Sequence, residues 1–258
     1  MLQQNRVKQG LAEGAVQIGV LQSFSAAAIT EIIGHVGYDF VMADGEHSPF
    51  DHHDMEHLAR TAEVTGMTPL VRVPGTDRRD ICRYLDAGAA GVIVPNVRTR
   101  AEVENALAAT AYPPAGNRGL ALPRASGFGA MPLPEFVDFA NDNTLRVIQI
   151  ETLEALDNLD DILSVPGVDV AFMGPLDVSA VLGVVGQVDH PEVVAIRRQI
   201  SESCARHGVV AGTFAFTPEQ LTSYVDEGFR FFLLGVDFLF LRQAASAALS
   251  AARSAVAE

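Results

Sequence analysis

The sequence predicts a (β/α)8 barrel, the TIM-barrel fold, as a single domain over residues 1–258. Eight short apolar runs alternate with amphipathic segments along the chain. The runs are rich in Val, Ile and Phe and mostly do not alternate with polar residues, as expected of parallel strands buried on both faces. A doubly wound open sheet is the alternative, but no GxGxxG fingerprint follows the first run, which weakens a dinucleotide-binding interpretation.

Each predicted strand is a short run that is followed by turn or helix signals. In chain order the strands are VQIGVL (16–21), YDFVMA (38–43), TPLVRV (68–73), AGVIVP (90–95), RVIQIE (146–151), DVAFMG (169–174), GVVAGTF (208–214) and RFFLLG (230–235). Helical patterns lie between them, for example over residues 26–37, 50–66, 76–88 and 99–112. Several patterns end in a glycine suited to closing a helix, namely Gly37, Gly66, Gly88, Gly208 and Gly228.

Two segments depart from this alternation. Residues 112–134, YPPAGNRGLALPRASGFGAMPLP, contain five prolines and four glycines and cannot form a simple helix. We expect a functional or disordered loop there, running towards the upper face of the barrel. The Ala-rich tail from Phe240 predicts a helix with an apolar stripe, which either covers its own barrel or packs on another subunit.

The composition excludes several classes of function. A net charge of −14 argues against binding to nucleic acid or to an anionic membrane surface. Cys82 and Cys204 lie in helical patterns without metal-ligand spacing, so we expect free thiols in a reducing compartment. The N-terminus lacks the apolar core of a signal peptide, and no apolar run reaches transmembrane length. We therefore expect a cytoplasmic protein.

Polar side chains gather where the predicted strands end. In a barrel these carboxyl ends form the catalytic mouth. Gln149 and Glu151 are two residues apart, so they lie on one face of their strand. The set of polar residues at or just beyond strand ends is Asp44, Glu46, His47, Arg72, Gln149, Glu151 and Asp177.

These residue types fit metal-assisted chemistry on an anion. Glu151 and Asp177 offer the oxygen ligands that Mg²⁺ or Mn²⁺ prefers, although Glu151 could instead cap the following helix and Asp177 could be a first-turn carboxylate. Residues 173–183, MGPLDVSAVLG, open a short helix whose backbone N–H groups could hold an anion. Arg72 could be a structural ion-pair partner or could stabilise an oxyanion.

His47 differs from the other six histidines through its place among acids at a strand end. Asp44 could fix its tautomer and leave the second ring nitrogen as a base. The others are expected to be surface or packing residues: His35, His52, His53, His57, His190 and His207.

The whole pattern resembles the metal-dependent pyruvate aldolases of the HpcH/HpaI family, the group of 4-hydroxy-2-oxoheptanedioate and 2-dehydro-3-deoxyglucarate aldolases. The matching motifs run in order over nearly the whole chain: DFVMADGEHSPFD, PLVRVP, LDAGAAGVIVPNV, YPPAGNRG, RVIQIET, VPGVDVAFMGPLDVSAVLG and HPEV. The resemblance implies a barrel whose last helix is exchanged with a neighbour, in a homohexamer built as a trimer of dimers. It also implies chelation of pyruvate on Mg²⁺, Mn²⁺ or Co²⁺, removal of a methyl proton, and attack of the enolate on an aldehyde.

The resemblance assigns roles residue by residue. Glu151 and Asp177 would hold the metal, Arg72 would bind the ketone oxygen, and Gln149 would position pyruvate. The pyruvate carboxylate would lie on the backbone N–H groups of the stretch from Gly174 to Asp177, which also contains Pro175 and Leu176. His47 would transfer the proton, possibly through a metal-bound water, with Asp44 as its orienting acid and Glu46 in support. Asp86 would reach the site of an adjacent subunit.

The departures from the family concern the substrate pocket. Leu21 stands where many relatives have Trp, and Phe214 stands where a smaller aliphatic residue is common. Arg118 and Arg124 are either ligands of a distal carboxylate or hydroxyl group, or structural residues. Lys8 is the only lysine, near an N-terminus that looks disordered, so a Schiff-base mechanism is nearly excluded.

We therefore expect a metal-dependent aldolase that makes or breaks 4-hydroxy-2-oxo acids, with pyruvate or hydroxypyruvate and an aldehyde as small-molecule partners. An oxaloacetate-type decarboxylase and a CoA-thioester lyase of the citrate-lyase-β type are alternatives. A non-catalytic metabolite-binding barrel is disfavoured, because such a protein would be expected to have lost a metal ligand, Arg72 or His47.

Overall fold

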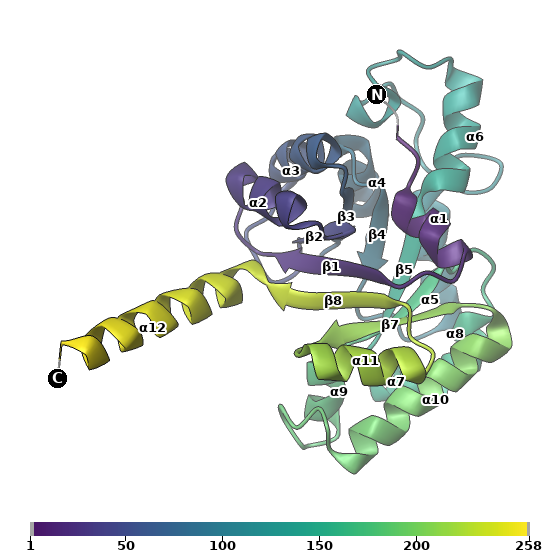
Figure 1. Cartoon of the computed structure of the whole chain (residues 1–258). Helices are drawn as coiled ribbons and strands as arrows, with labels where there is room; N and C mark the ends of the chain where they lie inside the picture. Colours follow the sequence, from purple (N-terminus) through teal and green to yellow (C-terminus); the bar gives the residue numbers. More distant parts are fainter. Residues whose placement is uncertain (1–2, 257–258) are drawn as a thin grey trace.

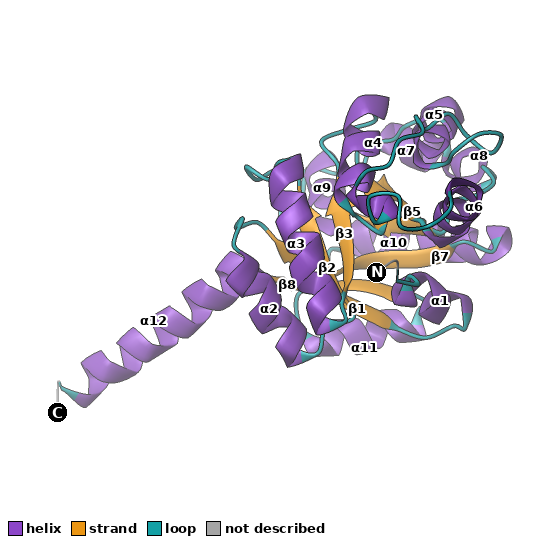
Figure 2. Cartoon of the chain, turned by 90° about the horizontal axis from the view of Figure 1, so that it is seen from above, coloured by secondary structure: helices purple, strands orange, loops and turns teal. Residues whose placement is uncertain are grey.

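The computed structural model describes residues 3–256 and contains a closed barrel of eight parallel strands (Figure 1, Figure 2). Each strand pairs with its neighbours in chain order, and β8 closes the barrel against β1. The strands are β1 (Gln17–Gln22), β2 (Phe40–Asp44), β3 (Thr68–Arg72), β4 (Gly91–Val94), β5 (Leu145–Ile150), β6 (Val170–Met173), β7 (Val210–Ala215) and β8 (Phe231–Val236). The predicted fold class and all eight predicted strands are confirmed.

Helices surround the barrel. They are α1 (Arg6–Ala12), α2 (Ala27–Val36), α3 (His52–Thr65), α4 (Arg78–Ala87), α5 (Arg100–Thr110), α6 (Leu133–Asn143), α7 (Leu153–Asp157), α8 (Leu159–Leu163), α9 (Pro175–Val181), α10 (Pro191–His207), α11 (Pro218–Asp226) and α12 (Asp237–Ala255), with a 3₁₀ turn η1 (Arg124–Ser126). The glycines expected at helix ends all have positive φ, as the left-handed C-terminal cap requires. No helix within residues 3–256 is both long and apolar enough to cross a membrane.

The interior of the barrel is apolar from its base to just below the strand ends. Alternate residues of each strand point inwards, and Phe40 stacks on Phe231 with ring centroids 4.5 Å apart. Gly19 makes room for this pair, because a Cβ there would lie 2.2 Å from the Phe40 ring. At the base, Val7 and Leu11 of α1 join the same buried cluster. The barrel is therefore a packed core that α1 covers at one end.

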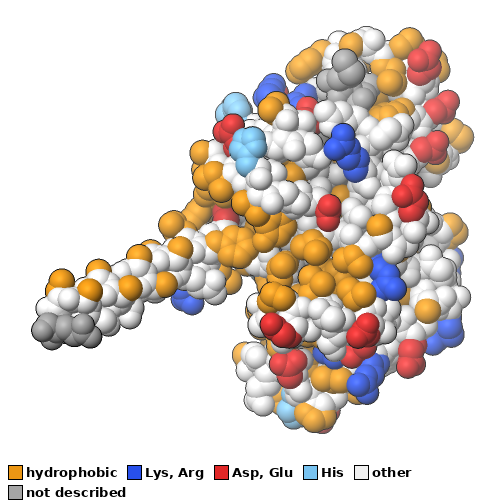
Figure 3. Space-filling view, viewed as in Figure 1, with side chains coloured by type: hydrophobic (Ala, Val, Ile, Leu, Met, Phe, Trp, Pro, Cys, Tyr) orange, Lys and Arg blue, Asp and Glu red, His pale blue; other side chains and the backbone are white. Residues whose placement is uncertain are grey.

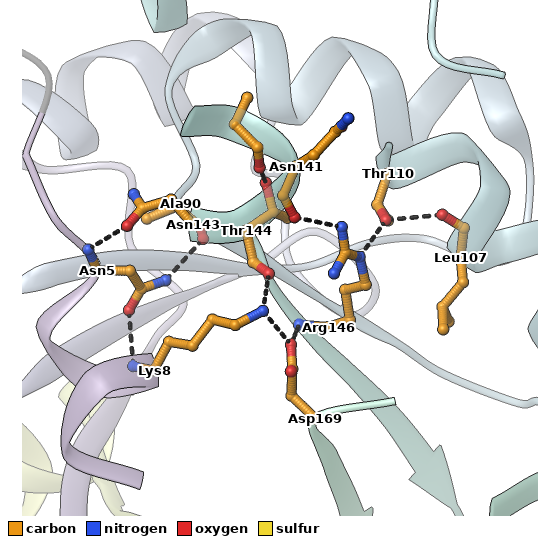
Figure 4. A network of polar contacts seen from close by, with 11 residues as sticks. Asn5, Lys8, Ala90, Leu107, Thr110, Asn141, Asn143, Thr144, Arg146 and Asp169 are labelled. Carbon is orange, nitrogen blue, oxygen red and sulfur yellow. Dashed lines mark hydrogen bonds and ion pairs between the residues drawn. The ribbon is translucent and has the colours of Figure 1, made fainter. Parts of the chain in front are cut away.

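Polar contacts tie α1 to the base of the barrel (Figure 4). The Lys8 ammonium group lies 3.0 Å from Asp169 and donates to the Thr144 carbonyl at 2.9 Å. The Asn5 side-chain amide donates to the Ala90 carbonyl. The expectation of a disordered N-terminus around Lys8 is therefore wrong. Short-range polarity suggested disorder, whereas these partners lie 85 to 161 residues away in sequence and leave no local signal.

The segment between α5 and α6 does not reach over the upper face of its own barrel, contrary to expectation. It leaves the lower end of α5 and follows the outer side of α4, where Arg78 donates to Asn117. Arg124 pairs with Glu63 near the end of α3, at 2.7 Å. A cavity of about 570 Å³ separates this segment and α6 from the ends of α3 and α4, remote from the carboxyl ends of the strands.

The last helix, α12, extends away from the barrel (Figure 1, Figure 2). Its first residue, Asp237, is buried and accepts hydrogen bonds from the backbone N–H groups of Ser23 and Phe24. Beyond this anchor the helix is exposed, and apolar side chains are visible along it (Figure 3). Its exposed large apolar residues are Phe238, Phe240, Leu241 and Leu249. The expected apolar tail helix is confirmed as far as Ala255; residue 257 of the predicted helix lies outside the described residues.

Candidate active site

Asp44 and Arg72 form an ion pair at the floor of the site. They are the last residues of β2 and β3 and stand opposite each other in the sheet register. The Arg72 guanidinium contacts both carboxylate oxygens of Asp44, with Nε to Oδ1 at 3.0 Å and Nη2 to Oδ2 at 2.9 Å. Both side chains are largely buried, with 13% of Arg72 and 4% of Asp44 exposed. A bidentate pair of this kind fixes the plane of the guanidinium.

Glu46 lies in the turn after β2 and makes three polar contacts. Its Oε2 atom lies 3.3 Å from Nη1 of Arg72 and 3.8 Å from Nε2 of His47. Its Oε1 atom accepts a hydrogen bond from the side-chain amide of Asn96 at 3.0 Å. The His47 ring is two-thirds exposed, so it borders the open side of the site.

This geometry changes the assignment of the acid that lies beside the His47 ring, which was expected to be Asp44. Asp44 accepts from the backbone N–H of His47, not from its ring, and its carboxylate is committed to Arg72. The carboxylate nearest the ring is Glu46, which the sequence had suggested only as support. Spacing along the chain could not separate two acids two residues apart at the end of one strand.

Gln149 and Glu151 come from β5 and the residue just after it, and both are buried. Glu151 Oε1 accepts from the backbone N–H of Asn96 at 2.7 Å, and Oε2 accepts from the Gln149 side-chain amide. Glu151 does not cap the next helix, because the side chain of Thr152 occupies the N-cap position of α7. The Glu151 carboxylate is therefore directed into the barrel mouth.

Asp177 approaches Glu151 from the first turn of α9. A Cβ placed on Gly174 would lie 3.0 Å from Asp177 Oδ2, 3.0 Å from Glu151 Oε2 and 3.2 Å from the Gln149 amide nitrogen. The glycine thus leaves space at the point where the two carboxylates converge. Any larger residue would press on both of them.

The backbone donors expected over Gly174 to Asp177 are fewer than the sequence suggested. Pro175 has no N–H group, and the Gly174 N–H donates to the Ile150 carbonyl at 3.4 Å. The N–H groups of Leu176 and Asp177 lie in the first turn of α9, where no intrahelical acceptor exists. An anion at this turn would be held by two donors.

The electrostatics of the site favour a bound cation. Burial, together with the nearby carboxylates of Asp177 and Glu46, raises the pKa of Glu151 to about 7, against the opposing hydrogen bonds from Asn96 and Gln149. Burial also raises the pKa of Glu46, opposed by Arg72. Converging oxygen donors with disfavoured negative charge are suited to a divalent cation. The residues present therefore fit the divalent metal that the resemblance implies.

A second acidic cluster, Asp51, His53 and Asp54, could also bring three ligand atoms together. Its carboxylates already serve as a capping box at the start of α3, and the cluster is largely exposed. It lies on a helix end and not on the strand ends that carry the buried acids. The cluster has a complete structural explanation in the cap.

Asp86, Arg118 and Arg124 do not join the mouth of their own chain. Arg118 is 3% exposed, pairs with Asp86 at 2.6 Å and stacks its guanidinium 4.6 Å over the Tyr112 ring. Arg124 pairs with Glu63. Within one chain these contacts match the structural alternative for both arginines.

Leu21 and Phe214 line the upper interior of the barrel, partly buried against its core. Phe214 packs on Phe216, with ring centroids 4.8 Å apart, and Phe216 is exposed at the rim. The two positions at which the sequence is expected to depart from the family pattern thus lie on β1 and β7, near the carboxyl ends of the strands.

Asn96 is the site residue that the sequence did not reveal. It follows β4 in the stretch VPNV and has φ 56°. The available signal was an asparagine just beyond a strand end, and asparagine is enriched in left-handed conformations. Nothing in the sequence connects it to Glu46 or Glu151.

Comparison with known proteins identifies the family. Residues 17–244 match the model of the family described as HpcH/HpaI aldolase/citrate lyase. The chain belongs to this family. It is 34% identical to a 2-dehydro-3,6-dideoxy-6-sulfogluconate aldolase from Pseudomonas putida, over 93% of this chain and 94% of that protein. It is 35% identical to a hydroxypyruvate/pyruvate aldolase from Sagittula stellata, over 95% and 97% of the two chains.

The chain also has the fold of a solved structure from the HpcH/HpaI family. A family protein from Burkholderia cenocepacia J2315 superposes with a TM-score of 0.91 at 30% identity, covering 96% of this chain and 99% of the other. As a member of this family, the protein has the aldolase, or lyase, type of activity. Its substrates are accordingly small molecules.

Proposed function

We propose that this HpcH/HpaI-family member is a divalent-metal-dependent aldolase that reversibly cleaves 4-hydroxy-2-oxo acids to pyruvate, or hydroxypyruvate, and an aldehyde. The observation that carries the proposal is the convergence of Glu151 and Asp177 beside Gly174, with Arg72 in the same mouth. Relatives named as aldolases of pyruvate and hydroxypyruvate support this choice of substrate.

Glu151 and Asp177 would hold the cation, which would be Mg²⁺, Mn²⁺ or Co²⁺. When bound, the cation supplies a Lewis acid for the oxygens of the 2-oxo acid. Gln149 holds Glu151 in place and faces the same space. The backbone N–H groups of Leu176 and Asp177 would bind the substrate carboxylate.

Arg72 would stabilise the negative charge that develops on the ketone oxygen. In cleavage, the proton leaves the 4-hydroxyl group, the C3–C4 bond breaks, and its electron pair forms the enolate of pyruvate as the aldehyde is released. A guanidinium already fixed by Asp44 does not reorganise during this step. Loss of one such fixed donor typically costs about 10²- to 10³-fold in rate.

His47 would carry the proton between the 4-hydroxyl group, the enolate carbon and solvent. Its ring is exposed on the open side of the site and lies beside Glu46. An imidazole at this position could accept the proton of the 4-hydroxyl group. Protonation of C3 then completes the release of pyruvate.

The test is exchange of the pyruvate methyl protons in heavy water, followed by NMR. A chelator should abolish the exchange and Mn²⁺ should restore it, whereas Arg72→Ala should remove it even with Mn²⁺ present. Arg198→Ala, an arginine on α10 whose side chain is 63% exposed, is the matched control and should exchange like the wild type. Full exchange in chelator would contradict the metal, and full exchange in Arg72→Ala would contradict the role of the arginine.

Decarboxylation of oxaloacetate remains an alternative within the lyases, because loss of CO₂ leaves the same enolate of pyruvate. A citrate-lyase-type activity on a CoA thioester is the other, since the family description includes citrate lyase. A panel of aldehydes with pyruvate and hydroxypyruvate, compared with oxaloacetate and a CoA thioester, separates the three. Turnover of the aldehyde panel is the expected result.

We also propose that α12 exchanges between subunits of a homo-oligomer, a hexamer built as a trimer of dimers. The exposed apolar residues along α12 support a partner for this helix. Asp86 on α4 is one-third exposed beside its partner Arg118, so it is available to approach the mouth of a neighbouring barrel in such an assembly.

A further inference from the structure

Asn96 has an uncommon backbone conformation at the mouth of the barrel. Its φ of 56° lies in the left-handed region, and within residues 3–256 only Phe128 shares this property among non-glycine residues. Such a conformation costs free energy for most side chains, and it is least costly for Asn, Asp and Gly. Non-glycine residues held in this way cluster at functional sites.

The conformation allows one residue to contact two carboxylates. The backbone N–H of Asn96 donates to Glu151 Oε1 at 2.7 Å. Its side-chain amide donates to Glu46 Oε1 at 3.0 Å. The acceptors belong to different strand ends, because Glu46 follows β2 and Glu151 follows β5.

In both acids the contact with Asn96 leaves the second oxygen facing the site. Glu151 Oε2 lies 3.0 Å from the space kept open by Gly174. Glu46 Oε2 lies 3.3 Å from the Arg72 guanidinium and 3.8 Å from the His47 ring. The contact with Asn96 restrains the rotation of each carboxylate about its terminal bond and so helps to set the direction of the other oxygen. In Glu151 the side-chain amide of Gln149, which donates to Oε2, adds a second restraint.

We propose that Asn96 is a positioning residue that fixes both carboxylates, Glu151 towards the metal position and Glu46 towards the proton-transfer group. The proposal rests on the function proposed above, since it assumes that Glu151 is a metal ligand. Asn96 acts through its two partners and touches no reacting atom. Partners of metal ligands typically change metal affinity or activity by about 10- to 100-fold when removed.

Two substitutions separate the backbone contact from the side-chain contact. Asn96→Gly keeps the left-handed backbone and its N–H but removes the amide. Mn²⁺ affinity should therefore stay within about twofold of the wild type, while kcat should fall about tenfold. In Asn96→Val the β-branched side chain opposes the left-handed conformation. Both contacts should be lost, and Mn²⁺ affinity should fall by at least about tenfold.

The control is Phe128→Val. It places valine at the other described non-glycine residue with a left-handed backbone. Phe128 lies on the segment between η1 and α6 and borders α3 and α4. It should leave Mn²⁺ affinity and kcat unchanged, whatever it does to thermal stability. A general effect of backbone strain would act on both valine variants alike.

The experiment is titration calorimetry of Mn²⁺ into the metal-free full-length protein, with kcat and KM measured at saturating Mn²⁺. A drop in Mn²⁺ affinity in Asn96→Val but not in Asn96→Gly, with reduced kcat in both, supports the proposal. Wild-type kcat in Asn96→Gly, or wild-type Mn²⁺ affinity in Asn96→Val, would overturn it. If the valine variant does not fold, kcat of the glycine variant decides.

The same titration distinguishes this inference from the proposed function. Wild-type protein that binds no Mn²⁺, or Glu151→Gln protein that binds it normally, would remove the metal site and the inference with it. Normal Mn²⁺ binding that depends on Glu151 but not on Asn96 would remove the inference alone.

Discussion

Glu151→Gln should make the metal-free protein more stable at alkaline pH while abolishing metal-dependent activity. Glu151 is 5% exposed, and burial together with Asp177 and Glu46 raises its pKa from 4.5 to about 7. The folded state therefore binds the proton more tightly than the unfolded chain does. The associated stability is fully present below pH 4.5 and is lost as the pH rises to about 7.

The size of the effect follows from the shift. At about 1.4 kcal/mol per pKa unit, ionising Glu151 in the folded protein costs on the order of 3 kcal/mol above pH 7. Glutamine does not ionise, so the variant avoids this cost. Between pH 5 and pH 8 the stability of the variant relative to the wild type should rise by about 2 kcal/mol, or roughly 5 °C in Tm for a chain of this size.

The assay is differential scanning calorimetry in chelator at both pH values. Glu154→Gln, an exposed acid in the first turn of α7, is the matched control and should show no such change. Mn²⁺ should stabilise the wild type at pH 8 but not Glu151→Gln, since only the wild type retains both carboxylates. A variant whose advantage is equal at pH 5 and pH 8, or absent at both, would refute the reasoning.

Three further predictions concern other parts of the molecule. Lys8→Met should lower the free energy of unfolding by about 2 kcal/mol, because Asp169 loses a charged partner, yet leave methyl exchange of pyruvate intact; loss of exchange would revive a lysine mechanism. Phe214→Val should widen the upper barrel and shift kcat/KM towards bulkier aldehydes; an unchanged aldehyde profile would place the acceptor elsewhere. A chain ending at Leu239, which keeps the Asp237 anchor, should form a smaller oligomer by light scattering; an unchanged mass would exclude exchange of α12.

The barrel was predictable because its signal is local and repeated. Apolar runs such as AGVIVP and DVAFMG identify buried parallel strands one at a time, and closure follows from their number. The segment at residues 112–134 was not predictable in the same way. Its path depends on contacts such as Arg124 with Glu63, 61 residues away, and composition reports only that it is irregular.

The sequence predicted which residues gather at the candidate site, but not which of them pair with one another. Strand ends placed Asp44, Arg72 and Glu151 together, because parallel strands end at one face of the barrel. Which acid serves which partner depends on side-chain rotation, so Asp44 and not Glu46 takes the bidentate pair with Arg72. Asn96 was not predicted, because its role depends on its left-handed backbone conformation, which the local sequence VPNV does not specify.

The packed base of the barrel has a consequence for the evolution and engineering of this protein. Phe40, Phe231 and the apolar face of α1 fill the lower layers, whereas the polar set occupies only the carboxyl ends of the strands. The residues that stabilise the barrel and the polar residues of the site therefore lie in different layers along the barrel axis. A library restricted to rim positions such as Leu21 and Phe214 should retain mostly folded members. New acceptor specificities can then arise on this scaffold without a loss of folding that later mutations must repair.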